Sequence, residues 1–125
     1  MDFNTIVACL VNVALKRGDA VSFTIPLYDP NNNNAPVDLS VFTGGFRAQI
    51  KVDGHRDNFV IELTSPTEIT VSTNSLTFII STAKSTVNRG KYVWDVQGID
   101  ASAKPTTLIE GDFEISQDTT RIIAP

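Results

Sequence analysis

The 125 residues suffice for one hydrophobic core and are too few for two domains of ordinary size. Hydrophobic residues make up 42% and charged residues 19%, which is typical of a folded globular domain and excludes a disordered chain. The net charge of −4 argues against nucleic-acid binding, because phosphate contacts need clustered Lys and Arg. The sequence therefore predicts a single domain, residues 1–125.

The N-terminal segment, residues 1–14, is apolar from Thr5 onward. Its first residues are acidic instead of basic, and the apolar run is far shorter than the ~20 residues that span a bilayer. We therefore expect no export signal and no membrane contact. A single cysteine, Cys9, cannot form an intramolecular disulfide, so synthesis in a reducing cytosol is expected. Because Cys9 lies in an apolar run without a basic neighbour, we predict a buried, unreactive thiol.

Apolar and polar residues alternate with a period of two in most of the remaining chain, which is typical of strands with one buried face. The alternating runs begin near Val21, Phe46, Phe59, Ile69, Leu76, Tyr92 and Thr107. With the N-terminal run, they predict about eight strands. The residues expected to be mostly buried between two sheets are Phe23, Phe46, Ile50, Phe78, Tyr92, Trp94 and Phe113.

Turn-forming residues separate these runs, as expected for consecutive antiparallel strands. The polar loop from Asp29 to Asn34, Asp53-Gly54, Arg89-Gly90 and Lys104-Pro105 are the clearest cases. One short helical turn is predicted in residues 81–88, where Ser81 or Thr82 would cap a crossing from one sheet to the other. The predicted fold class is all-β, a two-sheet antiparallel immunoglobulin-like β-sandwich.

Three groups of residues resemble, in order, the motifs of a known phage module. The first is Leu15-Lys16-Arg17-Gly18-Asp19, followed later by Ala35-Pro36-Val37-Asp38-Leu39-Ser40. The second is residues 81–86 followed by Gly90-Lys91-Tyr92-Val93-Trp94-Asp95-Val96, and the third is residues 108–115 followed by residues 118–120. This pattern resembles the phage virion β-sandwich module found at the N-terminus of the upper baseplate protein and in tail-fibre and virion accessory proteins.

The resemblance covers residues 15–120, and Val87 departs from it by standing where the family usually has Leu. It implies a structural or adaptor subunit of a bacteriophage particle, in the tail, baseplate, fibre attachment or capsid, that acts through protein-protein contacts. Its partners would be other virion proteins and further copies of the chain as a homo-oligomer. Its location would be the virion, assembled in the host cytoplasm.

Both ends of the chain are candidate docking extensions, namely residues 1–14 and 117–125. Residues on both faces of the first segment are apolar, and a strand with two apolar faces needs cover on both. A small sandwich covers one face, so a neighbouring protein could cover the other. The predicted partner contacts are Ile6, Ala8, Leu10, Ile122 and Ile123. The alternative is an ordinary inner strand and a frayed C-terminus.

Residues that could carry chemistry are few, and we predict neither an enzyme nor a cofactor or metal site. His55, the single histidine, lies in a hydrophilic turn. The carboxylates of Asp95, Asp100, Asp112 and Glu114 are candidate calcium ligands, but no acidic loop has the spacing of an EF-hand. The Arg17-Gly18-Asp19 triplet resembles an integrin motif, although a turn is the favoured interpretation.

Two other functions remain open at this point. A carbohydrate-binding module for a host surface glycan would use Trp94, Tyr28 and Tyr92, because aromatic faces stack on sugars. Trp94 alternates in step with core positions, however, which favours packing. The third hypothesis is an immunoglobulin-like domain of a bacterial adhesin.

Overall fold

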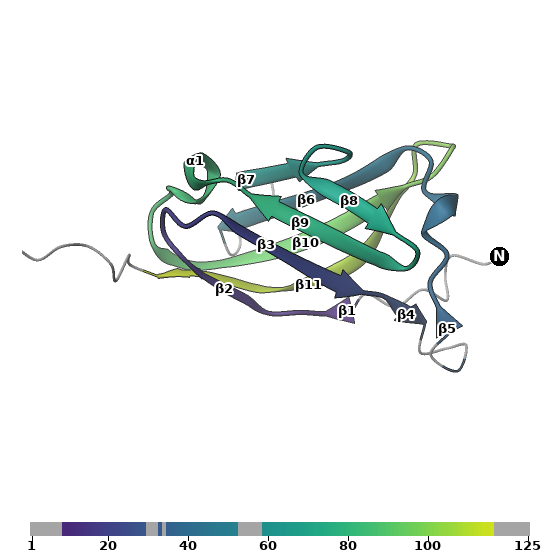
Figure 1. Cartoon of the computed structure of the whole chain (residues 1–125), viewed down its shortest axis with the longest axis horizontal. Helices are drawn as coiled ribbons and strands as arrows, with labels where there is room; N and C mark the ends of the chain where they lie inside the picture. Colours follow the sequence, from purple (N-terminus) through teal and green to yellow (C-terminus); the bar gives the residue numbers. More distant parts are fainter. Residues whose placement is uncertain (1–8, 30–32, 34, 53–58, 117–125) are drawn as a thin grey trace, which may run out of the picture.

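Two β-sheets packed face to face form an immunoglobulin-like sandwich (Figure 1), so the predicted fold class is confirmed. The computed structural model describes residues 9–29, 33, 35–52 and 59–116. The larger sheet, sheet A, consists of β1 (Cys9–Leu10), β2 (Val13–Lys16), β6 (Gly45–Val52), β7 (Phe59–Thr64), β10 (Gly90–Ile99) and β11 (Pro105–Ser116). The smaller sheet, sheet B, consists of β3 (Val21–Pro26), β8 (Ile69–Ser72) and β9 (Ser75–Ile80). A separate ribbon pairs β4 (Tyr28–Asp29) with β5 (Ala35–Pro36).

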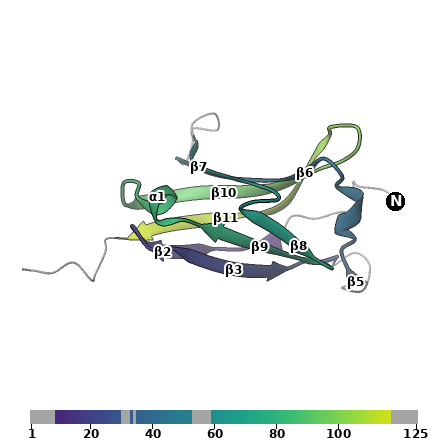
Figure 2. The same ribbon diagram turned by 45° about the horizontal axis from the view of Figure 1, so that its top comes forward.

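Most neighbouring strands are antiparallel, as the turn pattern predicts. In sheet A the order is β1-β11-β10-β6-β7, and β2 also pairs with β11; in sheet B the order is β3-β9-β8. The two layers separate clearly when the molecule is turned (Figure 2). One departure from the antiparallel pattern is the N-terminal run, because β1 and β2 both lie parallel to β11.

The core between the sheets centres on the indole of Trp94. Its ring centroid lies 5.5 Å from that of Phe78, 5.6 Å from that of Phe113 and 6.1 Å from that of Phe23, all in edge-to-face arrangements. Of the seven residues predicted to be buried, Phe23 is only partly buried, because it lies on an edge strand of sheet B. The other six are buried.

Two positions predicted to face the core are exposed instead. Phe59 belongs to the same alternating run as Ile61 and Leu63, but a register shift between Ile50 and Lys51 breaks the alternation there. Such a bulge moves a side chain off the face that the pattern assigns to it. Val71, the next apolar position of the alternating run that begins at Ile69, is exposed on the edge strand β8, although its register partner Leu76 is buried.

Short capped turns connect the layers. The helical turn α1 (Thr82–Ser85) carries the chain from β9 in sheet B to β10 in sheet A, and the Ser81 hydroxyl accepts a hydrogen bond from the Lys84 amide. Both features confirm the predicted crossing and its cap. Similarly, Asp38 caps the 3₁₀ turn Leu39–Val41 by accepting from the amide and hydroxyl of Ser40. Leu39 is thereby held in the core.

Replacing Trp94 by Ala should lower the free energy of unfolding by about 3–5 kcal/mol, because the substitution removes a buried aromatic side chain and leaves a cavity. Denaturant unfolding followed by far-UV circular dichroism measures this change. The conservative Trp94→Phe variant should lower the free energy of unfolding by a smaller amount, because it keeps an aromatic ring in the core. An unchanged midpoint for Trp94→Ala would contradict the central place of the indole in the core.

The stability contributed by Asp38 should depend on pH. The hydrogen bonds from the hydroxyl and amide of Ser40 hold the pKa of Asp38 below its usual value of 3.8. A carboxylate with a lowered pKa in the folded state stabilises the protein above the unfolded-state value, and this contribution disappears as the pH falls through the folded-state value. Asp38→Ala should therefore destabilise the protein at pH 7 more than in strongly acidic solution, as measured by thermal melts at both pH values.

Candidate interaction surface

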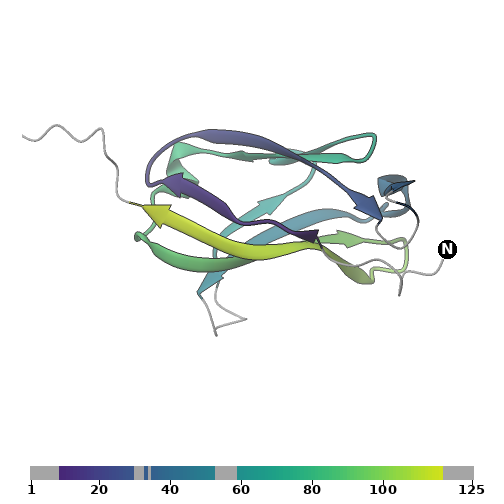
Figure 3. The same cartoon turned by 90° about the horizontal axis from the view of Figure 1, so that it is seen from below.

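The N-terminal strap, defined as residues 9–16, is the best candidate for a functional surface among the described residues. It contains β1 and β2 and lies along the edge of sheet A beside β11 (Figure 3). The strap is interrupted at Val11 and Asn12, which belong to neither strand. This interruption is where the strap is fastened to the sandwich.

Backbone and side-chain hydrogen bonds hold the interruption in place. The indole N–H of Trp94 donates to the Val11 carbonyl at 2.9 Å, and the Val11 amide donates to the Glu110 carbonyl at 2.9 Å. The Asp112 amide donates to the Asn12 side-chain oxygen at 3.0 Å. The residue at the centre of the core thus also binds the strap, which satisfies a buried indole N–H.

Gly111 makes this arrangement sterically possible. A Cβ atom at position 111 would lie 2.0 Å from the Val11 carbonyl oxygen, far inside van der Waals contact. The glycine of the third sequence motif is therefore explained by close approach of the strap backbone. The sequence shows the glycine, but it does not show that the approaching chain lies about a hundred residues away.

The predicted contact residue Leu10 lies on the strap and is 74% exposed. It pairs in register with Glu110 of β11. Val11 and Val13 are partly buried and pack against the core. One face of the strap thus packs against the core, while Leu10 on the opposite face is exposed to solvent. The other predicted contacts, Ile6, Ala8, Ile122 and Ile123, and most of both predicted docking extensions lie outside the described residues.

The prediction of a buried Cys9 thiol is wrong, because Cys9 is exposed. Its register partner, Ile109, is buried, but Cys9 itself lies on the outermost strand of sheet A. Apolar neighbours in sequence did not bury this residue because β1 has a neighbouring strand on one side only.

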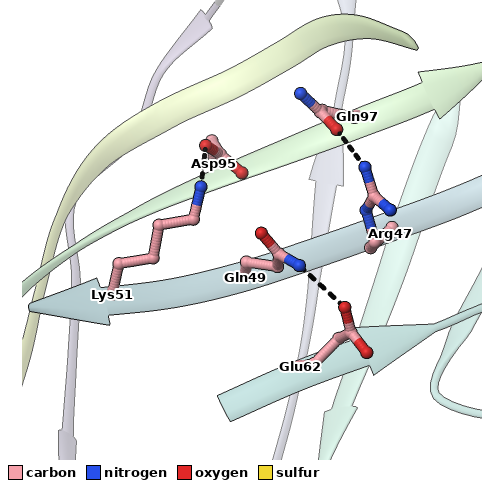
Figure 4. A network of polar contacts seen from close by, with 6 residues as sticks. All are labelled: Arg47, Gln49, Lys51, Glu62, Asp95 and Gln97. Atoms are coloured by element: carbon pink, nitrogen blue, oxygen red, sulfur yellow. Dashed lines mark hydrogen bonds and ion pairs between the residues drawn. The ribbon is translucent and has the colours of Figure 1, made fainter. Parts of the chain in front are cut away.

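Polar side chains cover the outer face of sheet A on β6, β7 and β10 (Figure 4). The Arg47 guanidinium donates to the Gln97 side-chain oxygen at 2.8 Å, and Lys51 forms an ion pair with Asp95 at 3.2 Å. The Gln49 amide donates to a carboxylate oxygen of Glu62 at 2.7 Å. These pairs join neighbouring strands on a solvent-facing surface, where such contacts add modestly to stability.

A shallow depression of about 400 Å³ lies between the strap and β10. Its lining includes the charged residues Lys91, Asp112 and Glu114, with Val93 and Ala14 as apolar positions. No histidine or cysteine contributes to it. It is open to solvent and lined by both signs of charge, so it has the character of a surface groove.

The first two sequence motifs meet in space at the turn formed by Arg17 and Gly18. The Arg17 Nε donates to the Val87 carbonyl at 2.9 Å, and the buried Ser85 hydroxyl donates to the Asp19 carbonyl at 2.8 Å. These contacts fasten the β2–β3 turn to the segment that follows α1. The Arg17-Gly18-Asp19 triplet therefore forms a structural turn, as predicted.

The aromatic residues of the glycan hypothesis are not brought together on one surface. Trp94 and Tyr92 are buried in the core, and Tyr28 is exposed on β4. A sugar needs an accessible ring face to stack on, so only Tyr28 of the three could supply one.

The described carboxylates considered for metal binding do not converge on one site. Within the described ranges, no group of three or more His, Cys, Asp or Glu residues is placed to hold a metal ion. Asp95 pairs with Lys51, while Asp100 accepts from the amides of Ser102 and Lys104 in its own turn. His55 lies outside the described residues. No described helix has the length and apolarity needed to cross a membrane.

Gly111→Ala should displace the strap and lower the free energy of unfolding by roughly 1–3 kcal/mol, because the added methyl group overlaps the Val11 carbonyl. Amide hydrogen exchange in residues 9–16 should accelerate. Gly90→Ala is the matched control, since the atoms nearest to a Cβ there belong to the Tyr92 side chain and lie at 3.8 Å or more, an ordinary van der Waals distance. If both variants retain the protection of the strap, the close approach at Gly111 is not what positions it.

Comparisons with known proteins give a similarity of fold alone. No protein-family model matches the chain, and a search of curated proteins found no match. Among solved structures, CopC from Methylosinus trichosporium OB3b is 11% identical over 92% of this chain and 89% of its own, with a TM-score of 0.40. Extracellular domains 3–5 of Drosophila OTK are 16% identical over 91% of this chain, with a TM-score of 0.32. This chain spans 35% of the OTK chain.

Proposed function

We propose that the chain is a structural or adaptor subunit of a bacteriophage particle that acts through protein-protein contacts. The ordered resemblance of residues 15–120 to the virion sandwich module supports this role. The structure gives the residues of those motifs architectural tasks: Asp38 caps a turn, Trp94 fills the core and Gly111 admits the strap. With these residues in structural roles, we expect the module to act by binding other proteins through its surface and its sheet edges.

The observation that carries the proposal is the exposure of Leu10. Leu10 is exposed to solvent although its strand is hydrogen-bonded to the sandwich. Complete burial of a leucine side chain by a partner would contribute roughly 1.5–3 kcal/mol to the free energy of binding. Leu10 directly follows the apolar segment that contains Ile6 and Ala8 in the sequence. We assign the partner contact to this side of the strap, with other virion proteins or further copies of the chain as the partner.

The acidic composition fits this role better than contact with nucleic acid. With a net charge of −4, the chain would be repelled by a phosphate backbone, whereas a protein partner imposes no such requirement. The proposed location is the virion, after assembly in the host cytoplasm. No cofactor, metal or membrane contact enters the proposal.

Leu10→Glu should abolish incorporation into particles, or self-association of the purified chain, while leaving the fold intact. The side chain is exposed, so the free energy of unfolding should fall by no more than about 1 kcal/mol, which allows for repulsion between the new carboxylate and Glu110, its register partner. Incorporation is measured by mass spectrometry of purified particles, and self-association by analytical ultracentrifugation. Ile79→Glu is the matched control, because Ile79 is 43% exposed but lies on the central strand of sheet B.

Removal of residues 1–4 and 120–125 provides a second test of the same contact. The truncated chain should fold and yet fail to assemble, because the predicted docking extensions are shortened at both ends. Assembly of both the truncated chain and Leu10→Glu at wild-type occupancy would place the contacts on sheet faces or loops instead. Loss of assembly in Ile79→Glu alone would assign the contact to sheet B.

A further inference from the structure

Among the described residues no strand pairs with the outer edge of β7, and side chains cover part of that edge instead. β7 is the last strand of sheet A on the side opposite the strap. The Ser65 amide donates to the Phe46 carbonyl. This bond shows which residues of β7 direct their backbone N–H and C=O groups toward β6. Backbone groups alternate in direction along a strand, so those of Leu63 face β6 while those of Glu62 and Thr64 point away from it.

The side chains of two charged residues form hydrogen bonds with these outward-pointing backbone groups. The Lys84 ammonium donates to the Glu62 carbonyl at 2.6 Å, and the Glu68 carboxylate accepts from the Thr64 amide at 3.2 Å. The Glu68 amide donates to the Thr64 carbonyl at 3.0 Å, and the Lys84 and Glu68 side chains form an ion pair with each other. Together these contacts engage both outward backbone groups of Thr64 and the carbonyl of Glu62.

An unprotected sheet edge is a template for pairing with another chain, and natural proteins block such edges with charges and bulges. Both devices are present on β7, since the register shift opposite Ile50 and Lys51 lies on the same strand. The rest of the strand invites pairing, because Phe59 and Val60 are exposed and uncharged. We propose that Lys84 and Glu68 form a guard that prevents β7 of a second copy of this chain from pairing with β7.

A second copy fits this edge because the edge is self-complementary. In an antiparallel pair related by a two-fold axis, Glu62 of one copy lies opposite Thr64 of the other, so the Thr64 amide of each copy could donate to the Glu62 carbonyl of its partner. These are the two groups that the Glu68 and Lys84 side chains cover. The guard residues come from α1 and from the turn before β8, so they reach the edge only in the folded chain. The inference is independent of the proposed virion role and of the strap.

The test is the double variant Lys84→Met with Glu68→Ala, which keeps the aliphatic stem of the lysine and leaves the net charge unchanged. Sedimentation velocity over a range of concentrations should show more dimer than the wild type forms. At low concentration the Thr64 amide should exchange faster than in the wild type, and at high concentration pairing should protect it again. Thr64→Pro added to this variant should remove the extra dimer, because proline deletes the outward N–H.

The matched control is Lys51→Met with Asp95→Ala, which removes an ion pair from the face of sheet A without opening an edge. It should sediment as the wild type does. Should the double guard variant fail to give a cooperative melt, Lys84→Met alone is measured in the same way. This variant frees the Glu62 carbonyl while Glu68 still covers the Thr64 amide, so it should gain a smaller amount of dimer. A folded guard variant that associates no more than the wild type, or extra dimer that survives Thr64→Pro, overturns the proposal.

Discussion

The indole of Trp94 is the contact on which the rest of the molecule depends. Its ring packs against phenylalanines of both sheets, and its N–H holds the carbonyl of Val11. A single side chain therefore joins sheet A, sheet B and the strap. Burial of the ring favours the sandwich, and burial of its N–H requires a partner, which the strap supplies.

Placement of the strap at the edge of sheet A follows from this requirement together with Gly111. Because position 111 has no side chain, the backbone at Val11 can approach β11 closely enough to accept the indole hydrogen bond. The same geometry turns Leu10 outward beside Glu110. The most exposed large apolar side chain among the described residues is thus a consequence of how the core is closed.

The two lateral edges of sheet A differ in what covers the backbone groups of the edge strand. On one side the strap adds strands parallel to β11, and on the other Lys84 and Glu68 cover the backbone groups of β7. Charged side chains at an edge discourage pairing, whereas a strand that ends in an exposed leucine invites contact. Under the proposed function and the proposed guard, association is directed toward the strap and away from β7.

Period-two alternation in the sequence was sufficient to predict most strands of the two sheets, most of the core and the fold class, because it records which face of a strand is buried. It did not predict the ribbon of β4 and β5, whose two-residue strands are too short to alternate. The caps at Asp38 and Ser81 were also predictable, since a cap and its amide lie within three residues of each other. Alternation does not name the partner strand, and it fails where a bulge or an edge intervenes, as at Phe59 and Val71. The parallel pairing of the strap, the exposure of Cys9 and the Lys84–Glu68 guard were decided by the tertiary structure alone, because each depends on a neighbour that is distant in sequence and adjacent only after folding.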